Sequence, residues 1–219
     1  MIPIKDYQSS GVFPVITITV IIITAAVFLM ELFSPDIEKF IYSWSLVPNR
    51  INFKDIASLY SFITSIFLHA GFVHIISNMW FLAIFGDNVE GALGKMKYLF
   101  FYLTGGVFAG LVQYFFMAGA SIPSLGASGA VAAVLGFYFV RFPHHTVKTL
   151  VPFFYLVILD LPSQFILGYW FLMQFLNGAA SLAVQTAVTG GVAWWAHIGG
   201  FLYGVFMARF IFKGKYQYV

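Results

Sequence analysis

The sequence contains no cysteine and few charged residues, and both absences narrow what the protein can be. Without cysteine there is no disulfide, thiolate nucleophile or thiolate metal site. Only 9% of the 219 residues are charged and 61% are hydrophobic, with a mean hydropathy of +0.90, whereas soluble domains carry about 25% charged residues. The 11 basic residues are scattered, so no basic patch for nucleic acid is present. We therefore expect a protein of the lipid bilayer that binds no nucleic acid.

Four charge-free runs predict six membrane-spanning helices. The runs cover residues 7–30, 56–86, 98–140 and 161–208. Because a span takes about 20 apolar residues, each of the first two runs holds one span and each of the last two holds two. The expected helices cover about residues 12–32, 70–86, 97–117, 124–141, 161–177 and 194–212. The predicted fold class is an all-α membrane protein, with a single domain over residues 1–219 and no soluble accessory domain.

The distribution of lysine and arginine predicts the orientation of these helices. With both termini in the cytoplasm, eight basic residues lie inside and three lie outside, which satisfies the positive-inside rule. We therefore expect a multi-pass protein of the cell (cytoplasmic) membrane. Residues 149–159 are apolar but only 11 in number, so they predict an interfacial or inner-leaflet segment and not a seventh span.

Polar side chains recur near the outer ends of the second, fourth and sixth predicted helices. These three helices run from outside to inside, so their first turns lie at a similar depth. The second carries His74 and Asn78, which are four residues apart and share a face; the fourth carries Ser128 and the sixth carries His197. Ionisable side chains are costly in lipid and tend to be functional. A serine, two histidines and an asparagine can therefore meet in one leaflet.

Glycines accompany the serine and one of the histidines. Gly200 and Gly204 follow His197 by three and seven residues and share its helix face, while Gly126 and Gly129 flank the predicted serine. Small residues allow helix backbones to approach closely. If the two glycine faces meet, the imidazole is brought to the serine hydroxyl. Tight packing alone would explain these four glycines as structural support. It would not explain why His197 lies on the same helix face as Gly200 and Gly204.

Each polar residue also has an alternative explanation. Ser128 could be a packing contact, and Asn78 could be an interhelical hydrogen-bond clip. His69, His74 and His197 could bind zinc, but no HExxH motif, cysteine or outer-leaflet carboxylate accompanies them, so we expect neither a metal nor a cofactor. The acidic residues are expected at inner helix ends, at the rim or in the first loop. The arrangement therefore favours a Ser–His dyad without an acid, with the imidazole as general base and then general acid.

Taken in order, these motifs resemble the rhomboid family of intramembrane serine proteases. The resemblance covers about residues 59–212, and its motifs are Phe67-Leu68-His69, His74 through Asn78, Gly86 through Gly94 with Glu90, Gly126-Ala127-Ser128-Gly129, and Ala196-His197-Ile198-Gly199-Gly200 through Gly204. It implies a six-helix rhomboid-like bundle of the minimal prokaryotic form. It also implies Ser128 as the nucleophile, His197 as the base, and an oxyanion hole formed by His74, Asn78 and the Ser128 amide.

The resemblance also implies an activity, and two other functions stay open beside it. The implied activity is endopeptidase cleavage in or near the transmembrane segments of protein substrates, at an active site that opens to the extracytoplasmic side. A proteolytically dead relative that binds membrane clients would lack the serine or the histidine, and this chain has both. A small transporter is disfavoured because charged midplane residues and broken paired helices are not evident.

The chain departs from the family pattern at a position close to the predicted serine. Many rhomboid relatives have an aromatic residue one helical turn after the serine, where it stacks on the catalytic histidine, but here that residue is Ala132. Trp194, Trp195 and Tyr138 are alternative ring partners for His197, and the sequence does not rank them. The departure leaves the expected catalytic residues in place.

Overall fold

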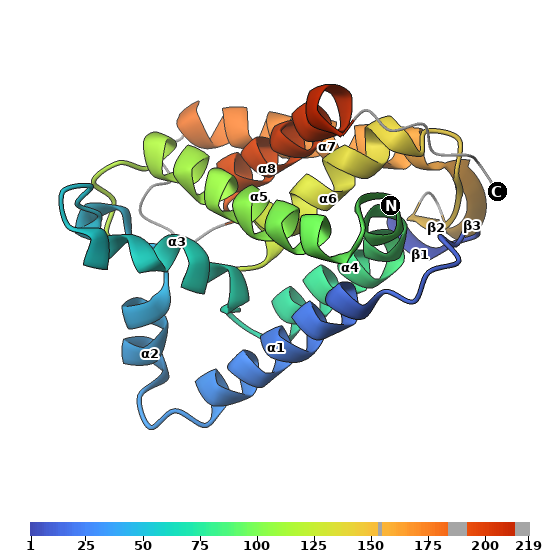
Figure 1. Cartoon of the computed structure of the whole chain (residues 1–219). Coiled ribbons are helices and arrows are strands. Elements are labelled where there is room, and N and C mark those ends of the chain that lie inside the picture. The colour runs from blue at the N-terminus through green and yellow to red at the C-terminus, as the bar shows by residue number, and fades with distance from the viewer. Residues whose placement is uncertain (153–154, 184–191, 213–219) are drawn as a thin grey trace.

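The computed structural model describes residues 1–152, 155–183 and 192–212, and Figure 1 shows how their helices and strands are arranged. The helices are α1 (Val15–Leu32), α2 (Ile37–Trp44), α3 (Ser61–Thr64), α4 (Phe72–Leu93), α5 (Lys95–Phe116), α6 (Ser128–Arg141), α7 (Ser163–Ala183) and α8 (Trp194–Phe206). The strands are β1 (Ile2–Asp6), β2 (Thr146–Pro152) and β3 (Leu156–Pro162). In Figure 1, α1 and α7 flank opposite sides of a centre formed by α5, α6 and α8.

Six of these helices correspond to the six predicted spans, but they differ in length. Among the described residues, α1, α4, α5 and α7 are long and apolar enough to cross a membrane. With 14 residues in α6 and 13 in α8, these two helices measure only about 20 Å, against about 30 Å for a hydrocarbon core. The predicted start of α6 at residue 124 is wrong, because Gly126 has a φ of +126° and interrupts the helix just before Ser128. The predicted sixth span continues beyond α8 only as a π-helical turn, Met207–Ile211.

The helices α1 and α4 are antiparallel, and at each end a buried acidic side chain connects them. Glu90, near the end of α4, accepts hydrogen bonds from the backbone N–H groups of Ile16 and Thr17 at 2.9 and 2.8 Å. A helix start leaves these amides without partners, so Glu90 completes the first turn of α1. At the opposite end, Glu31 of α1 accepts the backbone N–H of His69, just before α4 begins. The two contacts fix how α1 lies along α4.

Small residues allow α6 and α8 to pack with their backbones in contact. A Cβ atom on Gly200 would overlap the carbonyl oxygen of Gly129, and one on Gly204 would overlap the carbonyl oxygen of Ala133. Gly136 of α6 is pressed against the backbone of α8 in the same way. Any side chain at these positions would separate the two helices. The backbone approach therefore determines where the first turn of α8 lies beside the first turn of α6.

A three-stranded antiparallel sheet, ordered β1-β2-β3, lies at the end of the bundle where α6 finishes. The predicted helical class therefore holds for most of the described residues, and one small sheet, which was not predicted, is added to it. Along β2, Val147 and Thr149 are buried and alternate with more exposed residues, the period of two that a strand shows. Lys148 of β2 pairs with Asp160 of β3, so residues 149–152 and 156–159, which fall within the predicted interfacial or inner-leaflet segment, form strands.

Buried polar contacts attach β1 to the helices. Asp6, at the end of β1, accepts hydrogen bonds from the Tyr138 hydroxyl of α6 and, at 2.8 Å, from Nδ2 of Asn88 of α4. Nδ1 of His145 lies 2.8 Å from the Tyr138 hydroxyl oxygen and 3.7 Å from the Asp6 carboxylate. Tyr138 thus lies ten residues from the start of α6, among the contacts of the sheet. It is not a ring partner of His197, and that alternative is excluded.

The connection between α1 and α4 holds the segment that precedes α6. Leu46 and Ser124 form an isolated antiparallel bridge, with N–H to carbonyl distances of 3.0 and 2.8 Å. The carbonyl of Ser65 accepts the backbone N–H of Gly126 at 2.8 Å. These three backbone hydrogen bonds fix the chain immediately before Ser128, so they fix the predicted nucleophile as well.

Candidate active site

Ser128 is the first residue of α6, and the turn just before it packs against His74 of α4. A Cβ atom on Gly126 would lie 2.7 Å from both Cε1 and Nε2 of the His74 ring, so only glycine fits there. Ser128 itself is half-buried. Its position at a helix start matters, because unpaired N–H groups and the positive end of the helix dipole favour a negative charge there.

The imidazole of His69 bonds to the same turn, just before Ser128. Nε2 of His69 accepts the backbone N–H of Ala127 at 3.4 Å, and Nδ1 lies 3.3 Å from the carbonyl oxygen of Phe67. A neutral ring with its proton on Nδ1 makes both contacts. Burial, and after it repulsion by His74, lower the pKa of His69 to about 4, although the Phe67 carbonyl acts in the opposite direction. The ring is therefore neutral at pH 7 and can accept the Ala127 N–H.

His197 is buried in the first turn of α8, which α5 and α6 hold from two sides. Oε1 of Gln113, from α5, accepts the backbone N–H of Ala196 at 3.2 Å. A Cβ atom on Gly129, from α6, would lie 3.7 Å from the carbonyl oxygen of Ala196. The starts of α4, α6 and α8, which carry the predicted site residues, therefore lie together.

Two residues of α7 contact the His197 ring. Oε1 of Gln174 lies 2.7 Å from Nδ1 of His197, and both side chains are buried. The Trp170 ring lies 5.8 Å from the imidazole, centroid to centroid, with 36° between the ring planes. Trp194, one of the predicted ring partners, meets the imidazole edge-on at 6.1 Å and 88°. Trp195, another of them, instead stacks on Phe116 with centroids 3.6 Å apart.

The contacts made by Trp170 and Gln174 were not predicted, although the sequence carries a signal for them. The two residues are four positions apart, so they share one face of the predicted fifth helix. Ala132, at the position where relatives carry an aromatic residue, lies fully buried beneath Gly200. An aromatic side chain at Ala132 would not fit against α8 at this separation. The ring of Trp170 reaches the imidazole from α7 instead.

Asn78 lies one turn after His74 on α4, and its Nδ2 atom is buried without a hydrogen-bond partner among the described residues. Leaving a buried donor unpaired costs about 1–3 kcal/mol, so such donors are uncommon in folded proteins. An N–H group that has no partner in the resting protein and lies near a nucleophile can stabilise an oxyanion that forms only during the reaction. The packing alternative would instead require a partner for this amide.

Among the described residues, the polar partner of the His197 ring is an amide and not a carboxylate. Glu31, predicted at the rim, is fully buried, and its carboxylate accepts the backbone N–H of His69. Within residues 1–152, 155–183 and 192–212, no three His, Asp or Glu side chains form a group that could hold a metal ion. The predicted site residues supply a serine hydroxyl, imidazoles and amides.

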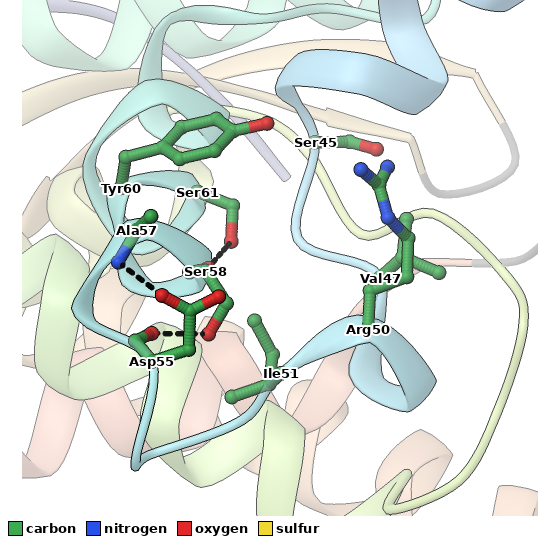
Figure 2. A pocket seen from close by; sticks show the side chains of 9 residues that line it. All are labelled: Ser45, Val47, Arg50, Ile51, Asp55, Ala57, Ser58, Tyr60 and Ser61. Carbon is green, nitrogen blue, oxygen red and sulfur yellow. Dashed lines mark hydrogen bonds between the residues drawn. The ribbon is translucent and has the colours of Figure 1, made fainter.

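The cavity at Ser128 is small, and the larger cavity of the two lies elsewhere. About 30 Å³ of space adjoins Ser128 and is lined mainly by glycine, alanine and serine, which is room for about one water molecule. A cavity of about 260 Å³ lies in the connection between α1 and α4 (Figure 2). Its charged side chains already bond to their own loop: Asp55 accepts the Ala57 N–H at 3.0 Å, and Arg50 donates to the Tyr42 carbonyl at 2.8 Å. No histidine lines that cavity, so we place the chemistry at Ser128.

Comparison with known proteins identifies the family. The sequence profile of the Rhomboid domain matches residues 57–214, so the chain belongs to the rhomboid family, whose members are typically intramembrane serine proteases. The chain is 34% identical over 152 residues to presenilin-associated rhomboid-like protein A, mitochondrial, of Danio rerio, covering 65% of this chain and 35% of that protein. It is 31% identical over 163 residues to rhomboid protein 1, mitochondrial, of Saccharomyces cerevisiae, covering 72% of this chain and 43% of that protein. The chain thus spans less than half the length of these relatives.

The same relatives contradict the predicted location. Both proteins are mitochondrial, as is a presenilin-associated rhomboid-like protein of Homo sapiens that is 30% identical over 155 residues. They point to a mitochondrial membrane and not to the cell membrane, so the prediction of a cell-membrane protein opening to the extracytoplasmic side is wrong. The prediction failed because the distribution of lysine and arginine orients helices relative to a membrane but carries no information about which membrane it is.

Proposed function

We propose that the protein is an intramembrane serine endopeptidase, with Ser128 as the nucleophile and His197 as the general base. Its substrates would be membrane proteins, cleaved in or near their transmembrane segments. The observation that carries the proposal is the meeting of three helix starts: the turn before Ser128 packs on His74, and the first turn of α8, with His197, packs on Gly129. Membership of the rhomboid family supports the same assignment.

The reaction follows from the roles of the two catalytic side chains. Nε2 of His197 takes the hydroxyl proton of Ser128 while Oγ attacks the carbonyl carbon of the substrate. The imidazolium then gives that proton to the departing amine, which breaks the peptide bond and leaves an ester on Ser128. A water molecule attacks the ester with the same imidazole as base, and the acid is released as the serine regains its proton. No carboxylate is needed for any of these steps.

Three donors are proposed to stabilise the oxyanion. The backbone N–H of Ser128 belongs to the unpaired amides at the start of α6. The His74 ring lies against Gly126, two residues before the nucleophile, and the unpaired Nδ2 of Asn78 lies one turn further along α4. Donors that are fixed before the reaction stabilise developing charge without any cost of rearrangement, and one such donor is worth about 10²- to 10³-fold in kcat.

The size of the cavity supports a restricted class of substrate. A helical segment has its carbonyl groups hydrogen-bonded, so it must unwind before one of them can be attacked. The space of about 30 Å³ beside Ser128 admits a small side chain and not an aromatic one. We therefore infer that the preferred substrates are transmembrane segments that unwind readily and carry small residues next to the cleaved bond.

Cleavage of a reporter membrane protein tests this proposal. The full chain, reconstituted in liposomes with a single-span reporter, should cleave the reporter within or beside its transmembrane span. Mass spectrometry of the products locates the cleavage site. Ser128→Ala and His197→Ala should remain folded and leave the reporter intact. Cleavage that persists in folded Ser128→Ala would contradict the proposed nucleophile. A folded wild type that binds the reporter and never cuts it would favour the function of binding clients without proteolysis.

A further inference from the structure

Gln174 is the polar partner of the His197 imidazole, and the contact determines which ring nitrogen carries the proton. The 2.7 Å separation joins Nδ1 of His197 to Oε1 of Gln174. An amide oxygen only accepts, so the proton of the neutral ring is on Nδ1 and the lone pair is on Nε2. With the opposite tautomer, Nε2 would carry a proton and could not take one from a hydroxyl. A neutral amide thus fulfils the orienting role that a carboxylate has in a Ser-His-Asp triad.

The surroundings of this contact make it specific. Gln174 is buried, whereas most side chains of α7 are not, so its amide is one of few α7 groups enclosed by the protein. Trp170, on the same face, packs on the imidazole, and Trp194 meets the ring from its edge. The ring is therefore restrained by two aromatic side chains as well as by one hydrogen bond. Only the hydrogen bond selects a tautomer.

We propose that Gln174 is the positioning residue of the catalytic base, holding His197 as the Nδ1–H tautomer with Nε2 available to Ser128. This inference rests on the proposed function for its kinetic consequence, but not for its effect on the tautomer. When the imidazole becomes protonated, the same amide oxygen still accepts the Nδ1–H, so the contact persists through the reaction. An amide carries no charge, so it stabilises the imidazolium less than a carboxylate would.

Two substitutions at this position separate positioning from packing. Gln174→Met keeps the length of the side chain and removes the acceptor, so we expect kcat to fall about 10- to 100-fold with little change in KM, the size of effect seen when a partner that orients a metal-bound imidazole is lost. Gln174→Glu restores an acceptor for Nδ1–H and should recover most of the rate. The added negative charge also favours the imidazolium, so the acidic limb of the pH–rate profile should move to higher pH.

Gln113 supplies a matched control. Among the residues that the structure describes, it is the other buried glutamine whose side chain bonds to α8, but it accepts the backbone N–H of Ala196 and does not contact the imidazole. Gln113→Met removes a buried acceptor of the same kind, so it should lower the melting temperature as Gln174→Met does. It should not move the pH–rate profile, because the tautomer of His197 does not depend on it.

The tautomer can be measured without any turnover. In the full chain labelled with 15N-histidine, the resonances lost in His197→Ala identify the ring, and wild type should show a protonated Nδ1 and an unprotonated Nε2. Gln174→Met should show a mixture of tautomers, while Gln113→Met should resemble wild type. Unchanged nitrogen shifts and an unchanged kcat in Gln174→Met would overturn the positioning role while leaving the protease assignment intact. If wild type fails to cleave but Gln174→Met changes the tautomer, the proposed function is wrong and the role of the contact stands.

Discussion

The carboxylate of Glu31 and the backbone N–H of His69 are joined by a buried hydrogen bond of 3.1 Å. The imidazole of His69 in turn accepts the N–H of Ala127, the residue before the predicted nucleophile. The end of α1 is thereby connected, through one histidine, to the turn that positions Ser128. This connection involves no residue of the proposed dyad, so its contribution to stability and its contribution to catalysis can be measured separately.

Removing the Glu31 carboxylate should destabilise the protein. Glu31→Ala leaves the His69 N–H buried without an acceptor, which costs about 1–3 kcal/mol. Glu31→Gln keeps one acceptor oxygen, so its loss of stability should be less than half that of Glu31→Ala. Glu38→Ala, an exposed change on α2, serves as the control. Melting temperatures of the four proteins in one detergent test the prediction, and equal values for Glu31→Ala and Glu38→Ala would contradict it.

His69 should make the folded state sensitive to acid. Its pKa of about 4 in the folded protein lies below the ordinary value of 6.5, so between these values the unfolded chain binds a proton that the folded chain does not. The stabilisation is complete above pH 6.5 and is lost as the pH falls toward 4, by at most about 1.4 kcal/mol per pH unit.

Melting temperatures between pH 7 and pH 4 measure this effect. His69→Gln retains an acceptor for Ala127 but cannot titrate, so its melting temperature should fall less steeply with acid than that of wild type. His144→Gln, an exposed change at the other end of α6, should follow wild type. Parallel curves for wild type and His69→Gln would show that His69 does not carry the acid sensitivity.

A methyl group at position 126 should lower the catalytic rate, because it would displace the His74 ring. Gly126→Ala strains the backbone at a positive φ and also places Cβ 2.7 Å from the His74 ring. Gly119→Ala imposes strain at φ +80°, but its Cβ would meet nothing within 4 Å. Both variants should melt at a lower temperature. Only Gly126→Ala should lose catalysis, by about 10²-fold if the ring moves by about 1 Å, and equal rates in the two variants would argue against a role for His74.

Asn78→Ala distinguishes an oxyanion donor from a packing contact. Its Nδ2 has no partner in the described chain, so its removal breaks no hydrogen bond and should leave the melting temperature almost unchanged. The loss of one oxyanion donor should lower kcat by about 10²- to 10³-fold with little change in KM. Turnover and melting are to be measured on the same sample. A normal kcat with a clearly lowered melting temperature would remove Asn78 from the site.

The positions of the catalytic candidates could be anticipated because they depend on simple periodicities. The charge-free runs and the alternating direction of the helices predict that three helices start at a similar depth in the membrane. A spacing of three residues predicts that Gly200 lies on the face of α8 that carries His197. In the structure that glycine lies on the backbone of Gly129, one residue after Ser128. Backbone contact of this kind leaves little freedom for the two first turns.

The remaining features depend on contacts between distant parts of the chain. Ile2 pairs with Leu150 in the sheet, and five residues of β1 show no period of their own that would mark them as a strand. Glu31 reaches a backbone amide 38 positions away, so no local pattern distinguishes it from an acid at the membrane surface. Gln174 bonds to a side chain on another helix, and only its spacing from Trp170 hinted at a shared role.

Labelling with a fluorophosphonate tests the central claim most directly, because this reagent modifies serines that are activated as nucleophiles. Detergent-solubilised wild type should acquire one adduct, and peptide mass spectrometry should place it on Ser128. Ser128→Ala and His197→Ala should acquire none, while Glu38→Ala should react as wild type does. A folded wild type that remains unlabelled, or an adduct on any other serine, would contradict the assignment of Ser128 and His197 as a catalytic dyad.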